Sequence, residues 1–561
     1  LAGRSLVSFH RGLQVTDGGT IAGRIALRDV PGWPRLSRDY VEKSGPAEAF
    51  FNGDFRDPAA FERQAKAVRA RPIPRDVLAE ILSDQNRRYG CGPRTLAGID
   101  RIARDRAGAI VTGQQAGLFS GPLYTVYKAL TAVKLAESLG ARGLGAFAPV
   151  FWLASDDHDA AEVDHITLLD RDNSLQDIRC LFPSPGSKIP ISDRPVPADI
   201  EDVFRRLDEL TPDSEFKADV LARLRDDYSP GRPFAEALAR WMTRLFGDSG
   251  LIILDPSDPR LRELGAGVFL HEIAGDSPST RSAGETSGRL AAAGYDPAIH
   301  LHEGILNLFF VETERKTIES KEGAFVIKET GRVFGRDELA DLAGRKPALF
   351  SPNVLLRPIY QDALLPTVAY IGGPGEIAYF AQMKGIYESF DLPMPIIYPR
   401  SSATILENKI GHVLEKYGLR LQDLWRDAAG SIGRIAEQQI PEGVRLGLLQ
   451  AFEHLDGDLD ALKSGIAAFE PTLGDAAGQT QGKIRQQLEF LDRKVRQAAK
   501  KRDEIALRQL QKSVDHLYPG GRLQERVFNI VPYLMKYGYS FLDRLDRSVE
   551  IGAFGHQVFV P

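Results

Sequence analysis

Two glycine-rich segments, each between a short apolar stretch and a helical pattern, constrain the fold of this chain most. The first follows residues 109–111, and the second spans residues 370–376, Tyr-Ile-Gly-Gly-Pro-Gly-Glu. Glycines in such turns let the backbone approach a ligand, and the next helix directs unpaired N–H groups toward it. Further strand–helix alternation predicts an α/β protein with a doubly wound parallel sheet interrupted by insertions. We expect both segments to meet over one crevice.

Charge and cysteine content exclude several classes of protein. The net charge of −5 disfavours binding to nucleic acid or to an anionic membrane. No apolar run reaches the ~20 residues needed to cross a bilayer, and no signal-peptide pattern is visible. The chain has only two cysteines, Cys91 and Cys180, which are too few for a disulfide framework and too far apart for the closely spaced cysteine pair of a zinc site. A cytoplasmic enzyme acting on small molecules fits best.

Composition and periodicity divide the 561 residues into several parts. The predicted parts are an N-terminal packing segment (1–107), the first half of the sheet domain (108–182), an insertion (183–232), a continuation of the sheet domain (233–299), a small β insertion (300–350), the second half of the sheet domain (351–403), a helical domain (404–520) and a C-terminal segment packing back on the core (521–561).

The helical domain carries a heptad pattern. Apolar residues recur in steps of three and four between Leu448 and Phe469, and again from Ile484. Residues 440–470 have a net charge of −4, whereas residues 482–517 have +5. Opposite charges and a short connection predict an antiparallel helical hairpin, whose outer face is suited to forming a homodimer. The acidic partner helix argues against nucleic-acid binding by the basic helix.

The first glycine-rich segment supplies one set of candidate binding residues. Glutamine side chains both donate and accept hydrogen bonds, glycines relieve crowding, and a lysine on the next helix can reach an anion. These candidates are Gln114, Gln115, Gly117, Gly121, Tyr124 and Lys128. The alternative is a plain strand-to-helix turn with a solvated lysine.

An acidic cluster follows the predicted strand at residues 146–154. Asp157, His158 and Asp159 lie where open α/β sheets hold their ligands, and such groups can bind an amine or transfer a proton. Asp residues that cap a helix N-terminus are the alternative. A metal site is less favoured, since zinc sites usually contain more His or Cys.

The second half of the sheet domain adds polar residues near its predicted strands. Pro358 prevents one smooth helix through Asn353, Arg357 and Gln361, and Arg357 is expected to hold a carboxylate, a phosphate or an internal ion-pair partner. The remaining candidates are Gly372, Gly373, Gly375, Glu376, Tyr379, Arg400 and Ser401. Alternatively, Glu376 only starts a helix and Arg400 is a surface cation.

Four stretches, residues 111–128, 149–165, 353–382 and 395–407, resemble the cysteine-adding ligase family of bacillithiol biosynthesis. The most specific motifs are Thr-Gly-Gln-Gln-Ala-Gly, Asp-His-Asp and Gly-Gly-Pro-Gly-Glu-Ile-Ala-Tyr. The resemblance implies a Rossmann-like core with connecting-peptide insertions and a dimerising coiled coil. It also implies an amide bond formed between L-cysteine and glucosaminyl-malate.

That family is likened to class I aminoacyl-tRNA synthetases, which activate amino acids as adenylates. This chain lacks their His-Ile-Gly-His and Lys-Met-Ser-Lys-Ser motifs, and Arg400-Ser401-Ser402 is a loose counterpart of the second. ATP is therefore expected by analogy alone. The working mechanism assigns proton transfer to His158 or a nearby Asp, phosphate stabilisation to Lys128 and Arg400, and carboxylate binding to Arg357.

Two other functions fit the same residues. One is a non-catalytic assembly or binding protein of the thiol pathway, suggested by the missing adenylation motifs. The other is an amide-forming or nucleotidyl-transfer enzyme that uses a different amine.

Overall fold

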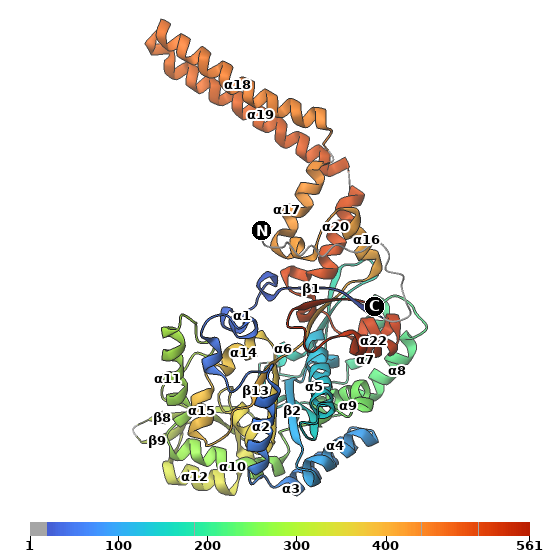
Figure 1. Cartoon of the computed structure of the whole chain (residues 1–561), viewed down its shortest axis with the longest axis vertical. Coiled ribbons are helices and arrows are strands. Elements are labelled where there is room, and N and C mark those ends of the chain that lie inside the picture. Colours follow the sequence, from blue (N-terminus) through green and yellow to red (C-terminus); the bar gives the residue numbers. More distant parts are fainter. Residues whose placement is uncertain (1–18, 185, 322, 439, 503) are drawn as a thin grey trace. The chain divides into compact units, whose positions relative to one another are not determined.

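A five-stranded parallel sheet forms the centre of the computed structural model, which describes residues 19–561 except 185, 322, 439 and 503. The strand order is β13-β12-β2-β3-β6, and Figure 1 labels β13 and β2 of this sheet. Strands β3 and β6 lie on one side of β2. Strands β12 and β13, which come later in the chain, lie on the other side. The strand order thus reverses between β2 and β12, where open α/β sheets leave a crevice at the carboxyl ends of their strands. The strands are β2 (Gly108–Gln115), β3 (Phe147–Ala154), β6 (Ile252–Leu254), β12 (Thr367–Gly372) and β13 (Ile396–Pro399).

Burial on both faces explains the nearly continuous apolar sequence of these strands. Helix α5 (Leu123–Ala141) crosses from β2 to β3, contacts both and is buried around most of its circumference. Other helices contact the sheet or follow it in the chain: α1 (Arg35–Glu42), α2 (Pro58–Ala70), α3 (Arg75–Arg88), α4 (Pro93–Arg104), α9 (Phe234–Phe246), α10 (Pro259–Ala274) and α11 (Pro278–Ala292). The predicted Rossmann-like, doubly wound fold is confirmed.

Two predicted boundaries are wrong. The first strand continues to Gln115, because the β2–β3 ladder pairs Gln114 with Leu153 and Gln115 with Ala154. Both glutamines therefore end a strand and do not lie in the turn. The apolar pattern after the second glycine-rich segment predicts one helix over residues 377–390, whereas the structure has two, α14 (Pro374–Phe380) and α15 (Lys384–Ser389).

The insertions form small structures of their own. The sequence predicts two strands in the β insertion, at residues 306–311 and 324–327. The structure has a larger five-stranded antiparallel sheet there, ordered β10-β9-β8-β7-β11. Its strands are β7 (Ile305–Val311), β8 (Arg315–Lys321), β9 (Ala324–Ile327), β10 (Arg332–Gly335) and β11 (Phe350–Pro352). Further elements are α6 (Ala160–Val163), β4 (His165–Leu169), β5 (Leu175–Arg179), α7 (Ile200–Leu210), α8 (Lys217–Asp227), α12 (Arg336–Arg345) and α13 (Arg357–Leu364).

The two ends of the described chain meet in a third sheet. Strand β15 (His556–Val560) pairs with β1 (Thr20–Ile25) and with β14 (Ser402–Ile405), which directly follows β13. The C-terminal segment also contains the short helical turn η9 (Gln524–Arg526), α21 (Val531–Tyr537) and α22 (Ser540–Ser548). Residues 522–561 belong to the same compact unit as the parallel sheet.

Residues 406–521 form a separate helical unit. It consists of α16 (Asn408–Lys416), α17 (Leu421–Gln438), α18 (Glu442–Phe469), α19 (Gly474–Arg502) and α20 (Glu504–Leu517). Helices α18 and α19 are antiparallel, because Asp456 pairs with Arg485 while Asp460 accepts a hydrogen bond from Gln481. The predicted hairpin of opposite charge is confirmed. Its connection, predicted at residues 471–482, spans only residues 470–473. Within the described residues, no helix combines the length and apolarity needed to cross a bilayer.

Candidate functional site

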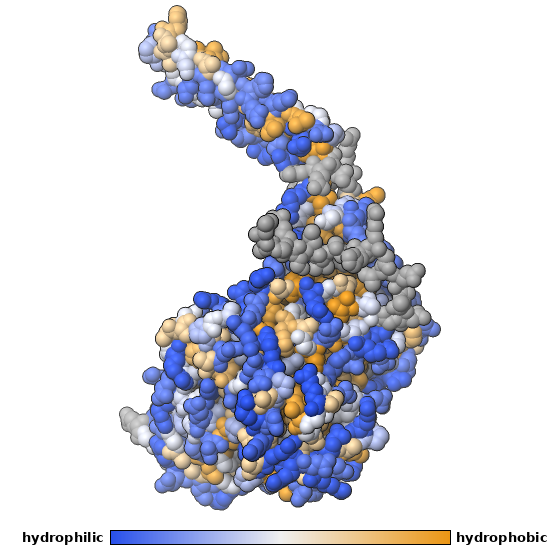
Figure 2. All heavy atoms as spheres, in the orientation of Figure 1, coloured by the Kyte–Doolittle hydropathy of each residue, from blue (hydrophilic) through white to orange (hydrophobic). Residues whose placement is uncertain are grey.

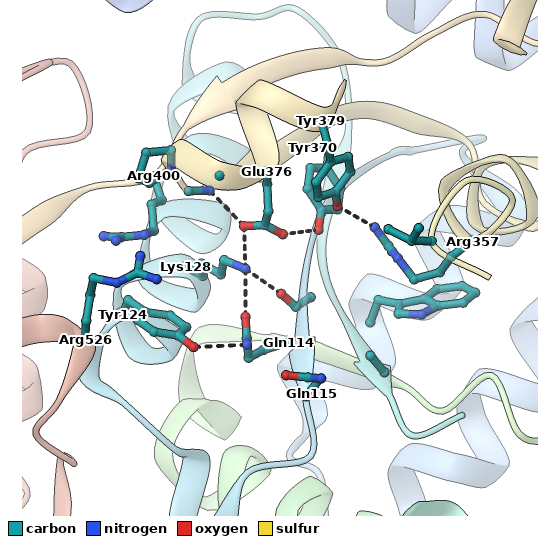
Figure 3. Close-up of a pocket in the computed structure, with 17 residues that line it drawn as sticks. Gln114, Gln115, Tyr124, Lys128, Arg357, Tyr370, Glu376, Tyr379, Arg400 and Arg526 are labelled. Carbon is teal, nitrogen blue, oxygen red and sulfur yellow. Dashed lines mark hydrogen bonds and ion pairs between the residues drawn. The ribbon is translucent and has the colours of Figure 1, made fainter. Parts of the chain in front are cut away.

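A cavity of about 380 Å³ opens where the order of the parallel strands reverses. Gln115 at the end of β2 and Gly373 after β12 both line it, so the two glycine-rich segments meet over one space. Figure 3 shows polar side chains from β2, α5, α13, α14 and the C-terminal segment pointing toward this space. Gly375, Trp152 and Val354 also belong to its wall.

An ion pair between Lys128 and Glu376 joins the two halves of the cavity. The Lys128 Nζ lies 2.5 Å from Glu376 Oε2 and also donates to Gly113 O (2.8 Å) and Gln114 Oε1 (2.9 Å). Burial lowers the pKa of Lys128, and the Glu376 carboxylate opposes that shift. The lysine side chain is 4% exposed, so the alternative of a solvated lysine is wrong.

Glu376 has a full set of donors around it. Its Oε1 accepts from the Tyr370 hydroxyl (2.7 Å) and its Oε2 accepts from the Gly373 N–H (2.8 Å). Burial acts to raise the pKa of Glu376, but the Lys128 ammonium outweighs it and holds that pKa below its usual value. Glu376 therefore both satisfies the start of α14 and neutralises Lys128 at the cavity wall.

Arg357 has only neutral hydrogen-bond partners among the described side chains. Its guanidinium donates to the Tyr379 hydroxyl (2.9 Å) and to Gln361 Oε1 (3.1 Å), and it lies over the ring of Tyr370. The alternative of an internal ion pair is wrong for the described part of the chain, in which no carboxylate lies within salt-bridge distance of Arg357. A cation with neutral partners in a cavity wall is suited to binding an anionic ligand.

Arg400 is buried and already paired, so it is neither an unpaired anion-binding residue nor a surface cation. It forms two hydrogen bonds to the Glu525 carboxylate, 2.7 Å and 3.1 Å long, and its side chain is 3% exposed. Glu525 also accepts from the Ser402 hydroxyl and the Ala403 N–H. The Arg400 charge is thus already neutralised where it lines the cavity. This pair fastens the C-terminal segment to the sheet unit.

The acidic cluster after β3 lies beside the cavity rather than in its wall. Asp157 Oδ2 accepts a 2.6 Å hydrogen bond from Gln115 Nε2, and the other Asp157 oxygen accepts the His158 N–H. Burial and the nearby Arg315 lower the pKa of His158, which leaves the imidazole neutral near pH 7. His158 and Asp159 line neither this cavity nor the one that adjoins it.

A second cavity of about 340 Å³ adjoins the first. The two share Gln114, Gln115, Tyr124 and Arg526. The turn that lines the second cavity is strained, because Phe119 and Ser120 have positive φ angles of 49° and 79°. Strained backbone of this kind gathers at ligand sites. Gly117, Gly121 and His165 also line this second cavity.

Several predicted site residues support the cavity walls without lining them. Asn353 accepts the Leu355 and Leu356 N–H groups just before α13, and Gln361 is fully buried beside Arg357. The Gly372 carbonyl accepts the Arg400 N–H, and the Ser401 N–H donates to Thr131. Pro358 occupies the first turn of α13, so no single helix runs through Asn353 and Gln361, as predicted. Within the described residues, no three His, Cys, Asp or Glu side chains gather as a metal site.

Sequence reasoning missed Tyr370, Glu525 and Arg526. Tyr370 lies within the second glycine-rich segment, where its buried position next to the turn was a usable signal. Glu525 and Arg526 come from the C-terminal segment, which was expected to pack on the core. No local sequence pattern distinguishes Glu525 or Arg526 from the other residues of that segment. The contact that brings this segment to the site, between Arg400 and Glu525, joins residues more than a hundred positions apart.

Two family models together match nearly all of the described chain. The model of the bacillithiol biosynthesis BshC N-terminal Rossmann-like domain matches residues 24–401, and that of the BshC C-terminal coiled-coil domain matches residues 403–560.

Individual relatives match over similar lengths. Proteins named "Putative cysteine ligase BshC" from Salinibacter ruber and Chloroherpeton thalassium are 36% and 34% identical, each over 94% of this chain and 96% of the relative. A solved structure titled as a putative arginyl-tRNA synthetase from Campylobacter jejuni covers 80% of this chain and 97% of its own at 11% identity, but its TM-score of 0.19 does not establish a shared fold. From the two domain models and these relatives, the chain belongs to the bacillithiol biosynthesis BshC family.

Proposed function

We propose that this protein is a cytoplasmic ligase that joins the carboxyl group of L-cysteine to the amine of glucosaminyl-malate. Family membership and the names of the relatives support a cysteine-adding role in bacillithiol biosynthesis. The structural observation that carries the proposal is the cavity shared by both halves of the sheet unit, with Arg357 in its wall. Among the described residues, no carboxylate lies within salt-bridge distance of that guanidinium. Glucosaminyl-malate brings two carboxylates that such a guanidinium can bind.

Forming an amide from a carboxylate requires activation, and we propose ATP as the activator. A cysteine carboxylate oxygen attacks the α-phosphorus and pyrophosphate leaves with the electrons of the broken P–O bond. The neutral amine nitrogen then attacks the carbonyl carbon, the C–N bond forms, and AMP leaves with the electrons of the C–O bond. A base accepts the proton lost by the amine. The support for ATP is this chemical requirement together with the analogy to adenylate-forming synthetases.

Residue roles follow from the contacts in the first cavity. We assign carboxylate binding to Arg357 and substrate orientation to Gln114 and Gln115, whose amide groups lie at the end of β2. Lys128 shapes the electrostatic potential of the wall as part of an ion pair, and does not act as a free cation. His158 stays a proposed proton acceptor because its imidazole is neutral near pH 7, although the ring lies outside the cavity wall.

Incubating purified protein with ATP, L-cysteine and glucosaminyl-malate tests the function. Mass spectrometry is expected to show bacillithiol, AMP and pyrophosphate in equal amounts. Absence of product with every nucleotide and thiol donor tried would remove the ligase proposal. Product with a different amine, found by screening amines in the same assay, would favour another amide-forming enzyme.

Changing Arg357 tests its role in binding. We expect Arg357→Ala to raise the KM for glucosaminyl-malate about tenfold or more, since a charge-assisted pair contributes ~1.5–3 kcal/mol. Gln361→Ala removes one partner of this guanidinium and is expected to have a smaller effect. An unchanged KM in a folded Arg357→Ala protein would contradict the assignment.

We also propose that two copies of the chain associate through the α18–α19 hairpin. Apolar residues on the predicted seam, such as Phe452 and Leu459, are only half-buried within the hairpin, and none of the α18 residues is fully buried. Leu449, Leu462 and Leu491 are more than half exposed. Figure 2 shows apolar residues among charged ones along this hairpin. A second hairpin would cover these side chains, which two helices alone cannot bury.

A further inference from the structure

We propose that Arg526 binds the anionic group of a substrate at the junction of the two cavities and thereby determines substrate specificity. The inference deepens the proposed ligase function, because it names a binding residue of the same site that no sequence motif marks. Its basis is the position of Arg526, the charge balance of the wall and the rigid attachment of its backbone.

Arg526 lies in the wall that the two cavities have in common. It lines both, together with Gln114, Gln115 and Tyr124. A guanidinium at this wall can contact a ligand in either cavity, or a ligand that spans both. In Figure 3, Arg526 and Arg357 lie on opposite sides of the drawn pocket, with the Lys128–Glu376 pair between them.

The charge balance of the wall leaves Arg526 available for an anion. Lys128 is neutralised by Glu376, and Arg400 by Glu525. Across the described part of the chain, no carboxylate lies within salt-bridge distance of Arg526, whose guanidinium lies 5.8 Å from the centre of the Tyr124 ring. Arg526 is also exposed, so an incoming ligand can reach it without unfolding the wall.

The backbone that carries Arg526 is held through the two residues that precede it. Gln524 exchanges two hydrogen bonds with the backbone of Ile405, and Glu525 bonds Arg400, Ser402 and Ala403. Gln524 and Glu525 are each 1% exposed. Because this backbone is already fixed, binding has to order only the Arg526 side chain, which favours recognition.

A guanidinium binds carboxylate and phosphate oxygens through two parallel hydrogen bonds, which an ammonium cannot reproduce. Both groups occur among the proposed substrates, as the malate carboxylates and the ATP phosphates. The shared chemistry is a planar or tetrahedral oxyanion. Separate titrations distinguish which of the two sources Arg526 recognises.

The experiment is titration calorimetry of the full chain with L-malate and, separately, with inorganic pyrophosphate. We expect Arg526→Gln to weaken the binding of one of these anions about tenfold or more. The affinity of Arg526→Lys for that anion should lie between those of Arg526→Gln and wild type. The exposed Arg547 of the same segment lies outside both cavities, so Arg547→Gln serves as the matched control and is expected to change neither affinity. Circular dichroism of each variant verifies folding.

Loss of malate binding assigns Arg526 to the carboxylates, and loss of pyrophosphate binding assigns it to the phosphates. The proposal is overturned if Arg526→Gln leaves both dissociation constants within about twofold, since this is below 0.5 kcal/mol. It is equally overturned if wild type binds neither anion at millimolar concentration. These titrations need no turnover. Arg526-dependent binding in a protein that makes no product would therefore reject the ligase function alone, whereas normal KM values for Arg526→Gln in an active enzyme would reject this inference alone.

Discussion

At the scale of single residues, the Lys128–Glu376 pair predicts a strong coupling between a buried ammonium and a largely buried carboxylate. We expect Glu376→Gln to lower the free energy of unfolding by about 3 kcal/mol at pH 7, because it leaves the ammonium of Lys128 buried without its partner. Removing both charges in Lys128→Met/Glu376→Gln should cost less than the sum of the single changes. Urea unfolding measures all three values. Additive effects would show that the pair is not coupled.

His556 predicts a loss of stability in mild acid. Burial lowers its pKa to about 4, with Ser402 and Thr404 hydroxyls at its two ring nitrogens. Between pH 6.5 and pH 4 the folded chain therefore binds fewer protons at this site than the unfolded chain, so stability falls as pH falls. From pH 7 to pH 5 this residue is expected to cost about 2 kcal/mol.

Urea unfolding at the two pH values measures that cost. His556→Gln has no titrating group at this position, so its unfolding free energy should fall less between pH 7 and pH 5 than that of wild type. An equal fall in both proteins would show that His556 does not titrate as inferred.

At the scale of elements, the closeness of β2 and β3 explains why residue 113 is a glycine. A Cβ at Gly113 would lie 2.7 Å from the Trp152 carbonyl oxygen, which is main chain and cannot rotate away. We expect Gly113→Ala to destabilise the sheet unit by about 1–3 kcal/mol and to reduce activity by shifting Gln114. Gly375→Ala is the matched control, since its Cβ would meet no atom within 4 Å. Equal melting temperatures for the two variants would contradict this explanation.

At the scale of the whole molecule, the exposed apolar side chains of the hairpin predict a dimer. We expect wild type to sediment as a dimer and Leu449→Glu/Leu462→Glu to sediment as a monomer, because a buried unpaired carboxylate is costly at an apolar interface. The neighbouring exposed residue offers a control, Gln450→Glu, which should stay dimeric. A monomeric wild type at micromolar concentration would refute the proposal.

The sequence by itself determined the parallel sheet, the meeting of the two glycine-rich segments and the antiparallel hairpin. These features follow from apolar periodicity, turn residues and charge patterns, which act between neighbours in the chain. Only the tertiary structure decided which cations remain unpaired. Lys128 pairs with Glu376, and Arg400 with Glu525, across long stretches of sequence. Arg526 lines the cavity without a carboxylate partner in the described part of the chain. The spacing of residues along the chain does not predict such pairings, because only the folded structure brings the paired side chains within a few ångströms of each other.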